Sequence, residues 1–435
     1  MASHDCIVAY EPATCEFPIQ NLPYGVFSTA SATSPRVGVA IGDKVLDLAA
    51  LAAKGLFNGP LLADCATDLF NQPSLNAFMA TKPEVWAEAR ARITELLTAG
   101  AGALDEATQA EVLVDMADIT SHMPVNVPEY IDFYSSRTHA TNVGTLIRGA
   151  ENALQPNWTA MPIGYHVAST SLTVSPAKIV RPWVQTTSPT DPTAFSFKPE
   201  PALDFELEMG AFVGGPANAQ GVPLRINEAH ERLFGLCLFN DWSARAGQKA
   251  SYVPLGPSII GKSFISTISP WIVPFAALEP FAVAAEVLDK PLAPHLRDDN
   301  HIVYNVDLSV DIITPGSNGE ELPITRSNLT YLTWTHAQQL TNLASTGAPI
   351  LPGTLLATGT ISGPNREQNG CMLEISKLGK DPLVLPTGEE RKYIADGDVV
   401  VMRGVARGDG YQIGFGETRD VVEAALPPSF WGIEE

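Results

Sequence analysis

The chain has 435 residues, which suits two domains or one large domain with an appendage, and 45% of them are hydrophobic, so a substantial core is feasible. A formal net charge of −21 would repel phosphate backbones and anionic lipids, which argues against nucleic-acid and membrane partners. The 34 glycines and 35 prolines are spread along the chain and favour a turn-rich, mainly β protein over a helical bundle.

The cysteines and the first residues indicate the compartment. Five cysteines are an odd number and no two have C-x-x-C spacing, so neither a disulfide framework nor a zinc site is expected. Residues 1–12 lack the cationic flank and apolar run of a signal peptide. No stretch reaches the roughly 18 apolar residues that a membrane helix needs. We therefore expect a soluble, cytoplasmic protein.

The opening third of the chain reads as a separate unit. Residues 36–48 predict a β-hairpin, since two alternating apolar runs flank a Gly-Asp turn. Residues 84–98 have the apolar spacing of an amphipathic helix, and a second helix is predicted over 104–119. Two prolines follow, and the character of the sequence changes. These signals predict one domain over residues 1–120 and a second over 121–435.

Strand signals dominate the second domain. Short apolar or alternating runs bounded by turn residues lie at 203–213, 234–241, 302–313 and 398–405. Residues 327–344 predict one long helix. The proline-rich stretch 181–203 is expected to be an ordered excursion or a loop.

A run of alternating acids, Asp204-Phe-Glu206-Leu-Glu208, is the most informative local pattern. On a strand the three carboxylates would share one face, close enough to repel one another. In a partly buried site a cation would have to neutralise them, and hard oxygen ligands of this kind suit Ca²⁺ or Mg²⁺. The alternative is an edge strand with a solvated acidic face.

Further polar residues follow the predicted strands. Asp241 ends the apolar run 234–239, where it could meet a ligand or metal, or cap the next turn. The segment 132–137 repeats that pattern and is followed by His139, which could be a general base or simply a hydrogen-bonded histidine. Glu374 lies in a short apolar run that predicts a strand, and there it needs a partner.

Glycine-spaced segments could bind anions. Residues 256–263 match the bare P-loop pattern, but prolines precede the lysine and a strand-like run follows it, so nucleotide binding is not expected. Lys262 could still present its charge to a substrate oxygen. Residues 358–363 and 408–416 could bind anions through exposed amides, or could form tight turns between strands.

Taken together, these motifs resemble the fumarylacetoacetase family over nearly the whole chain. The second-domain motifs are DFYSSRTHATNVG (132–144), ENALQPNW (151–158), DFELEM (204–209), NDWSAR (240–245), YVPLGP (252–257), GTISGP (359–364) and GDGYQIGFG (408–416). The first-domain motifs are NLPYGVFST (21–29), RVGVAIGD (36–43) and FNQPSLNAFM (70–79).

The resemblance implies a fold, a partner and a metal site. The fold would be an N-terminal SH3-like barrel and a C-terminal β-roll, assembled as a homodimer. Matching positions assign a Ca²⁺ site, and they leave Asp204 outside it. The implied Ca²⁺ ligands are Asp132, Glu206, Glu208 and Asp241. A second site, for Mg²⁺, would involve Asp241, Lys262 and Ser266.

The resemblance also implies an activity. The substrate would be 4-fumarylacetoacetate, a dicarboxylate β-diketone, cleaved by water at a carbon–carbon bond in the last step of tyrosine and phenylalanine breakdown. His139 would be the general base, oriented by Glu374. The expected oxyanion donors are Arg245, Gln248 and Lys262. The expected substrate contacts are Tyr134, Arg148, Tyr165, Gln248, Tyr252 and Thr360.

Two departures from the family pattern and two rival functions accompany this prediction. The loop from Tyr252 to Lys262 is one residue longer than in the family's animal members, and Ser266 stands where threonine is expected. One rival is a superfamily relative: an acylpyruvate hydrolase, a decarboxylase or a hydroxymuconate-type isomerase. The other is a metal-stabilised binding protein without turnover.

Overall fold

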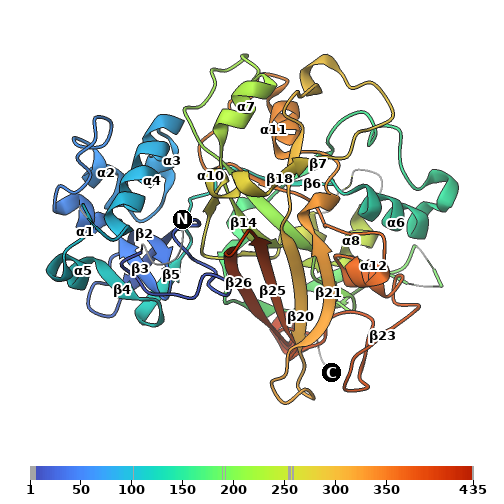
Figure 1. The fold of residues 1–435 in the computed structure, drawn as a ribbon. Coiled ribbons are helices and arrows are strands. Elements are labelled where there is room, and N and C mark those ends of the chain that lie inside the picture. Colours follow the sequence, from blue (N-terminus) through green and yellow to red (C-terminus); the bar gives the residue numbers. More distant parts are fainter. Residues whose placement is uncertain are drawn as a thin grey trace.

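The computed structural model describes residues 6–433 except 101, 189, 192, 253–255, 257 and 258. Figure 1 shows a smaller unit built from the first part of the chain beside a larger one built from the rest. Sheets form the framework of both units, and most of the strands lie in the larger one. The prediction of a mainly β protein is therefore confirmed.

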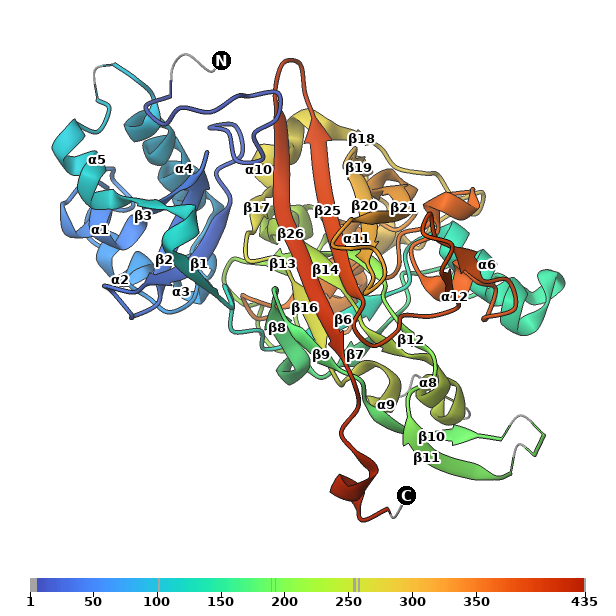
Figure 2. The same cartoon turned by 90° about the horizontal axis from the view of Figure 1, so that it is seen from below.

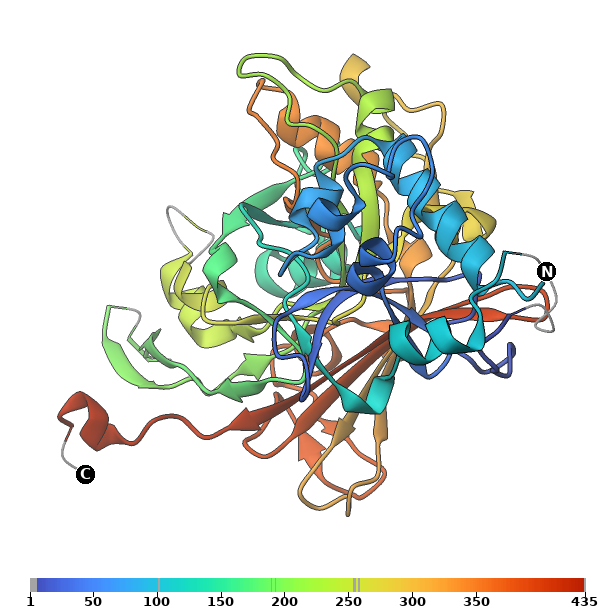
Figure 3. The same cartoon turned by 90° about the vertical axis from the view of Figure 1, so that its left-hand side faces the viewer.

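The N-terminal unit is an antiparallel five-stranded sheet covered by short helices (Figures 1 and 3). In sheet order its strands are β4 (Leu113–Asp115), β3 (Lys44–Asp47), β2 (Arg36–Ile41), β1 (Tyr24–Thr29) and β5 (Ile119–His122). Its helices are α1 (Leu48–Ala53), α2 (Ala66–Phe70), α3 (Asn76–Met79), α4 (Pro83–Leu97) and α5 (Glu106–Val112).

Two of the three N-terminal predictions are confirmed. The predicted hairpin is β2 and β3, turning at Gly42, whose φ of +58° suits glycine. The predicted helix over 84–98 is α4. The helix predicted over 104–119 is wrong beyond Val112, because the chain turns there into β4, which pairs with β3, and then into β5, which pairs with β1. Pairing with distant strands overrides local helix propensity.

The C-terminal unit consists of two curled sheets packed face to face (Figure 2). The eight-stranded sheet contains β7 (Gly164–Val167), β6 (Tyr130–Phe133), β22 (Leu355–Ala357), β13 (Leu207–Val213), β14 (Leu233–Asn240), β16 (Ser266–Ile268) and β8 (Leu172–Val174), with β17 (Val273–Pro274) beside β14. The five-stranded sheet contains β21 (Leu322–Asn328), β20 (Asp307–Ile313), β25 (Val399–Arg407), β26 (Gln412–Glu423) and β9 (Lys178–Val180).

An apolar core lies between these sheets, and an aromatic cluster joins the two units. Leu236 and Leu238 of one sheet share a fully buried cluster with Val310 and Phe415 of the other. At the junction the Phe234 ring lies 5.8 Å from the Tyr24 and Phe78 rings and 5.1 Å from the Trp86 ring of α4. Burying a large apolar side chain stabilises a fold by about 1.5–3 kcal/mol, so this cluster holds the N-terminal unit against the C-terminal unit.

The predicted strands exist, but two of them are broken. Residues 234–241 and 398–405 correspond to β14 and β25. The run 203–213 divides into β12 (Leu203–Asp204), which pairs with β15 (Ser243–Ala244), and β13, which pairs with β14. The run 302–313 divides into β19 (Ile302–Tyr304), which pairs with β18 (Ala282–Ala284), and β20. Each break lies where the chain changes its pairing partner.

Two further predictions are corrected. The helix predicted over 327–344 is helical only in α11 (His336–Ala344), because Thr335 caps the helix there and the preceding residues complete β21 and a 3₁₀ turn. Glu374 lies in a short helix, α12 (Met372–Ile375), and not in a strand. The remaining C-terminal helices are α6 (Arg137–Arg148), α7 (Ile226–Arg232), α8 (Arg245–Ser251), α9 (Ile259–Lys262) and α10 (Phe275–Leu278).

Residues 181–188, 190, 191 and 193–203 are described, and they form a hairpin with its flanking segments. The hairpin consists of β10 (Trp183–Thr187) and β11 (Phe195–Pro199), and it projects from the body near the C-terminal end of the described chain (Figure 2). Its inner strand packs on α8, where Val184 contacts Gly247 so closely that a Cβ there would lie 2.9 Å from the valine side chain. A final small pair consists of β23 (Leu383–Val384) and β24 (Glu390–Arg391). Among the described residues no helix is both long and apolar enough to cross a bilayer.

Candidate active site

Four buried carboxylates meet at one edge of the eight-stranded sheet. Strands β6, β22 and β14 run in the same direction, and β13 is antiparallel to them. The C-terminal ends of these three strands therefore lie beside the N-terminal end of β13. Asp132 lies near the end of β6, Asp241 follows β14, Glu206 immediately precedes β13, and Glu208 is the second residue of β13. Each offers an oxygen within 4.8 Å of the others, and none is more than 4% exposed.

Two cations and a hydroxyl contact this cluster. The Lys262 ammonium forms ion pairs with Glu206 and Asp241 and lies 3.6 Å from Asp132. A guanidinium nitrogen of Arg245 lies 2.8 Å from Glu206. The Ser266 hydroxyl donates to Asp241 at 2.9 Å. Four carboxyl groups therefore face two cationic side chains, so ionisation of all four would leave a negative excess.

The electrostatics of the cluster favour an added cation. Burial raises the pKa of Asp132 and of Glu208, and the neighbouring carboxylates raise both further. Glu206 is the exception, since Arg245 and Lys262 lower its pKa despite its burial. One oxygen of Asp132 and one of Glu208 are buried without a hydrogen-bond partner among the described residues. All-oxygen, net-negative donors of this kind fit a hard divalent cation.

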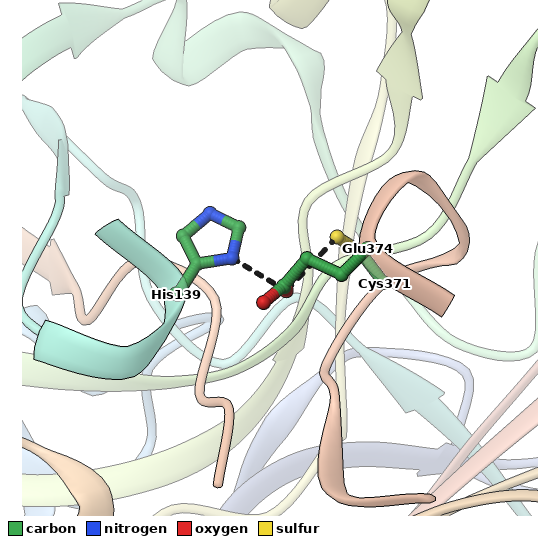
Figure 4. Close-up of side chains that lie close together, drawn as sticks. All are labelled: His139, Cys371 and Glu374. Atoms are coloured by element: carbon green, nitrogen blue, oxygen red, sulfur yellow. Dashed lines mark hydrogen bonds and ion pairs between the residues drawn. The ribbon is translucent and has the colours of Figure 1, made fainter. Parts of the chain in front are cut away.

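A buried histidine and a buried glutamate form a hydrogen-bonded dyad, which Figure 4 shows. His139 lies in the first turn of α6, which Ser136 caps, and its Nδ1 is 2.6 Å from Glu374 Oε2. It is close enough to Glu206 for its charge to lower that residue's pKa. Although burial opposes it, His139 lowers the pKa of Glu374, as do donated hydrogen bonds. An ionised Glu374 therefore accepts a hydrogen bond from the Nδ1–H of a neutral imidazole, whose Nε2 then carries the lone pair that can accept a proton.

Three residues to which the sequence analysis gave no role at the dyad complete the surroundings of Glu374. The Ser362 hydroxyl donates to Oε2 at 2.7 Å, and the Asn142 amide donates to Oε1 at 2.9 Å. The Cys371 Sγ lies 3.3 Å from Oε2. Asn142 follows His139 by three residues and so lies on the same helix face, which a helix prediction would have suggested. Ser362 and Cys371 are brought in by the fold.

Asp204 connects the two halves of the site. One oxygen accepts from the Arg245 Nε at 2.9 Å and from the Leu373 amide at 3.0 Å, and the other accepts from the Met372 amide at 2.8 Å. Asp204 therefore caps the helix that carries Glu374 and also holds Arg245, whose other nitrogen lies 3.3 Å from the Gln248 side-chain oxygen. The sequence pattern placed Asp204 among three candidate ligands, and the family resemblance implied only that it lies outside the metal site.

The predicted substrate contacts fall into two groups. The Tyr134 ring packs edge-on against His139 at 5.3 Å, and Tyr165 hydrogen-bonds to Asp132. The Thr360 hydroxyl is buried without a partner in the described part of the chain. Arg148 instead donates to backbone carbonyls beyond the end of α6, and Tyr252 is 43% exposed. The loop from Tyr252 to Lys262, predicted to be longer, lies partly outside the described residues.

Comparisons with known proteins agree with this architecture. A family model described as Fumarylacetoacetase N-terminal matches residues 20–124, and one described as Fumarylacetoacetate (FAA) hydrolase C-terminal matches residues 129–423. A Bos taurus protein named fumarylacetoacetase is 48% identical over 94% of this chain and 97% of its own length. The Homo sapiens protein of that name is 47% identical over 95% and 98%.

A solved structure shows the same fold at low identity. The structure described as an HpcE protein from Mycobacterium smegmatis has a TM-score of 0.50 and 17% identity, and it covers 92% of this chain and 99% of its own. The match of both family models across most of the sequence settles membership. The chain belongs to the fumarylacetoacetase family.

Proposed function

We propose that this protein hydrolyses 4-fumarylacetoacetate to fumarate and acetoacetate, the last step of tyrosine and phenylalanine breakdown. The observation that carries the proposal is a buried His139–Glu374 dyad beside a four-carboxylate cluster. It occurs in a chain that aligns over 94–95% of its length with relatives named fumarylacetoacetase.

The dyad supplies the nucleophile in this proposal. The Nε2 of His139 takes a proton from water while ionised Glu374 holds the imidazole and stabilises the imidazolium. The resulting hydroxide attacks the carbonyl next to the fumaryl group. Arg245, Gln248 and Lys262 face the developing alkoxide, and such a donor is typically worth about 3–4 kcal/mol. The imidazolium then returns its proton to the leaving acetoacetate.

The acidic cluster would hold the metal. Asp132, Glu206, Glu208 and Asp241 are the proposed Ca²⁺ ligands, and Asp241 with Lys262 and Ser266 forms the proposed Mg²⁺ site. A divalent cation held there would supply positive charge that stabilises the acetoacetate leaving group. Tyr134, Tyr165 and Thr360 would contact the bound diketone, while Arg148 and Tyr252 would have to turn inward to meet a carboxylate.

We further propose that the protein is a cytoplasmic homodimer whose domains divide near residue 120. The five cysteines are free in the described structure, as a reducing compartment would keep them. Light scattering would show twice the chain mass of 46.5 kDa if the dimer forms.

A substrate panel tests the proposal. The purified, metal-loaded protein is given fumarylacetoacetate, acylpyruvates and oxaloacetate, and products are followed by ultraviolet absorbance and chromatography. Rapid formation of fumarate and acetoacetate, with the other substrates turned over poorly, is the expected result. Preferential turnover of an acylpyruvate or of oxaloacetate would assign the same site to a rival activity. Metal binding without any product would indicate a binding protein.

A further inference from the structure

Cys371 is a buried thiol that the proposed mechanism does not use, and it lies beside the catalytic dyad. Its Sγ is 3.3 Å from the same Glu374 oxygen that lies 2.6 Å from His139 Nδ1 (Figure 4). A ring nitrogen, a thiol sulfur and a carboxylate oxygen thus lie within 4.8 Å of one another, and all three residues are buried. Imidazole nitrogen, thiol sulfur and carboxylate oxygen are three different kinds of metal ligand, and here they lie close enough together to bind one ion.

This donor set selects a different metal from the acidic cluster. Thiolate and imidazole prefer Zn²⁺, whereas carboxylate oxygens alone suit Ca²⁺ and Mg²⁺. A tetrahedral zinc would separate its nitrogen and oxygen ligands by about 3.3 Å, given bonds of about 2.0–2.1 Å. His139 and Glu374 would therefore have to move apart by less than about 1 Å. One thiolate and one carboxylate also balance the charge of a dication.

We propose that His139, Cys371 and Glu374 form an inhibitory Zn²⁺ site that is distinct from the acidic cluster. Zinc binds Nδ1, the thiolate and the carboxylate, and water takes the fourth position. The thiol proton passes to solvent, and the remaining imidazole proton moves to Nε2. An imidazole protonated at Nε2 cannot accept a proton from water, so turnover stops. The inhibition rests on the proposed function, but the binding of zinc does not.

The state of the metal-free thiol argues against an oxidation switch. Burial raises the pKa of Cys371, and the charge of Glu374 raises it further. The protonated thiol is a poor nucleophile and resists oxidation. Zinc has to displace its proton, so binding tightens as the pH rises.

Inhibition is tested by zinc titration with Ca²⁺ saturating. Each variant is measured relative to its own rate without zinc. Cys371→Ser should raise the half-inhibitory zinc concentration at least about tenfold, since even outer partners of a metal site change affinity by 10–100-fold. Cys65→Ser is the matched control, because this partly exposed thiol donates to the Leu61 carbonyl and a serine can do the same. Equal inhibition of Cys371→Ser, or relief by excess Ca²⁺, would overturn the proposal.

A second measurement does not depend on turnover. Co²⁺ is added to the Ca²⁺-loaded protein as a spectroscopic probe, and the thiolate-to-cobalt absorbance is recorded. One equivalent should bind in the wild type and in Cys65→Ser, and the band should disappear in Cys371→Ser, whose folding is checked by thermal melting. A band that survives in Cys371→Ser would refute the site. Because no substrate is used, this result is independent of whether the proposed hydrolase activity is correct.

Discussion

At the scale of single residues, His139 depends on the groups that hold Glu374. The carboxylate receives hydrogen bonds from His139, Ser362 and Asn142, so its charge is stabilised although it is only 3% exposed. A buried carboxylate without such donors would become neutral and would not fix the imidazole tautomer.

The first prediction concerns the base. His139→Ala should lower kcat by about 10²–10⁴-fold, the range for loss of a general base, and leave the fold intact. The control is His295→Ala, which removes an exposed histidine whose ring lies 3.5 Å from the Asn342 side chain. Steady-state kinetics and circular dichroism provide the comparison. A near-native rate for His139→Ala would exclude it as the base.

A second histidine should govern part of the pH dependence of stability. Burial lowers the pKa of His336 from its usual 6.5 to about 4. Between these two pH values the unfolded chain binds a proton at His336 that the folded chain does not. The free energy of unfolding is therefore unaffected by this residue above pH 6.5, and it decreases as the pH drops toward 4. The loss amounts to about 3 kcal/mol.

Urea unfolding between pH 4 and 7 measures this effect. His336→Gln removes the titrating group, so its unfolding free energy should fall less steeply over that window than that of the wild type. Parallel curves for the two proteins would show that His336 titrates normally in the folded state.

At the scale of elements, short helices place the reacting groups and buried carboxylates hold those helices. Glu200, at the end of β11, accepts from the amides of Ala246 and Gly247 in the first turn of α8, whose own N-cap residue provides no side-chain cap. Asp204 does the same for α12. Helices of seven and four residues are not stable alone, so these contacts position Arg245 and Glu374.

The third prediction tests the Asp204 contact. Asp204→Asn removes the charge that joins Arg245 to α12, and hydrogen bonds to charged groups are worth about 1.5–3 kcal/mol. We expect kcat to fall at least about tenfold with a smaller change in KM. Asp398→Asn is the matched control, since this buried aspartate also binds an arginine, Arg391, and a backbone amide. If both variants lose stability and keep kcat, Asp204 has a structural role only.

Local sequence patterns predicted the elements whose structure is decided locally. The hairpin at 36–48 and the helix α4 carry their own turn and periodicity signals, and both are present. The helix predicted over 104–119 failed because β4 and β5 pair with strands about 70–95 residues earlier, a partner choice that periodicity does not contain. Strand 203–213 broke for the same reason.

The candidate site shows the same limit. The alternating acids indicated a cation site, and the family resemblance supplied the other proposed ligands. Cys371 and Ser362 could not be found in this way, because each is more than 220 residues from His139 in the sequence and only the fold brings them together. The His139–Glu374 contact likewise joins residues that are 235 positions apart. The proposed zinc site combines one cysteine with a histidine more than 220 residues away, so the spacing between cysteines argued against a zinc site.

At the scale of the whole molecule, the acidic cluster lies where several strands of the main sheet end. Repulsion among its carboxylates destabilises the packing of these strand ends. The net charge of −21 adds a general repulsion. A bound divalent cation should therefore stabilise the entire fold, by about 2.7 kcal/mol at a hundredfold excess over its Kd.

The fourth prediction uses this linkage. Wild-type protein should melt at a lower temperature in chelator than in Ca²⁺. Glu208→Gln removes a carboxyl group whose ionised form is disfavoured by burial and by the neighbouring acids, so the variant should be at least as stable as wild type in chelator and gain much less from Ca²⁺. Calorimetry under both conditions gives the comparison. An equal Ca²⁺ gain in both proteins would remove Glu208 from the ligand set.

The most direct test of the whole account is the loss of fumarylacetoacetate ultraviolet absorbance on adding the protein, before and after chelation. The account predicts rapid loss, abolition by the chelator, and recovery on adding Ca²⁺ or Mg²⁺, with no recovery in His139→Ala. Unchanged absorbance with folded, metal-loaded protein would contradict the assigned substrate, and turnover that survives complete chelation would contradict the role of the four-carboxylate site.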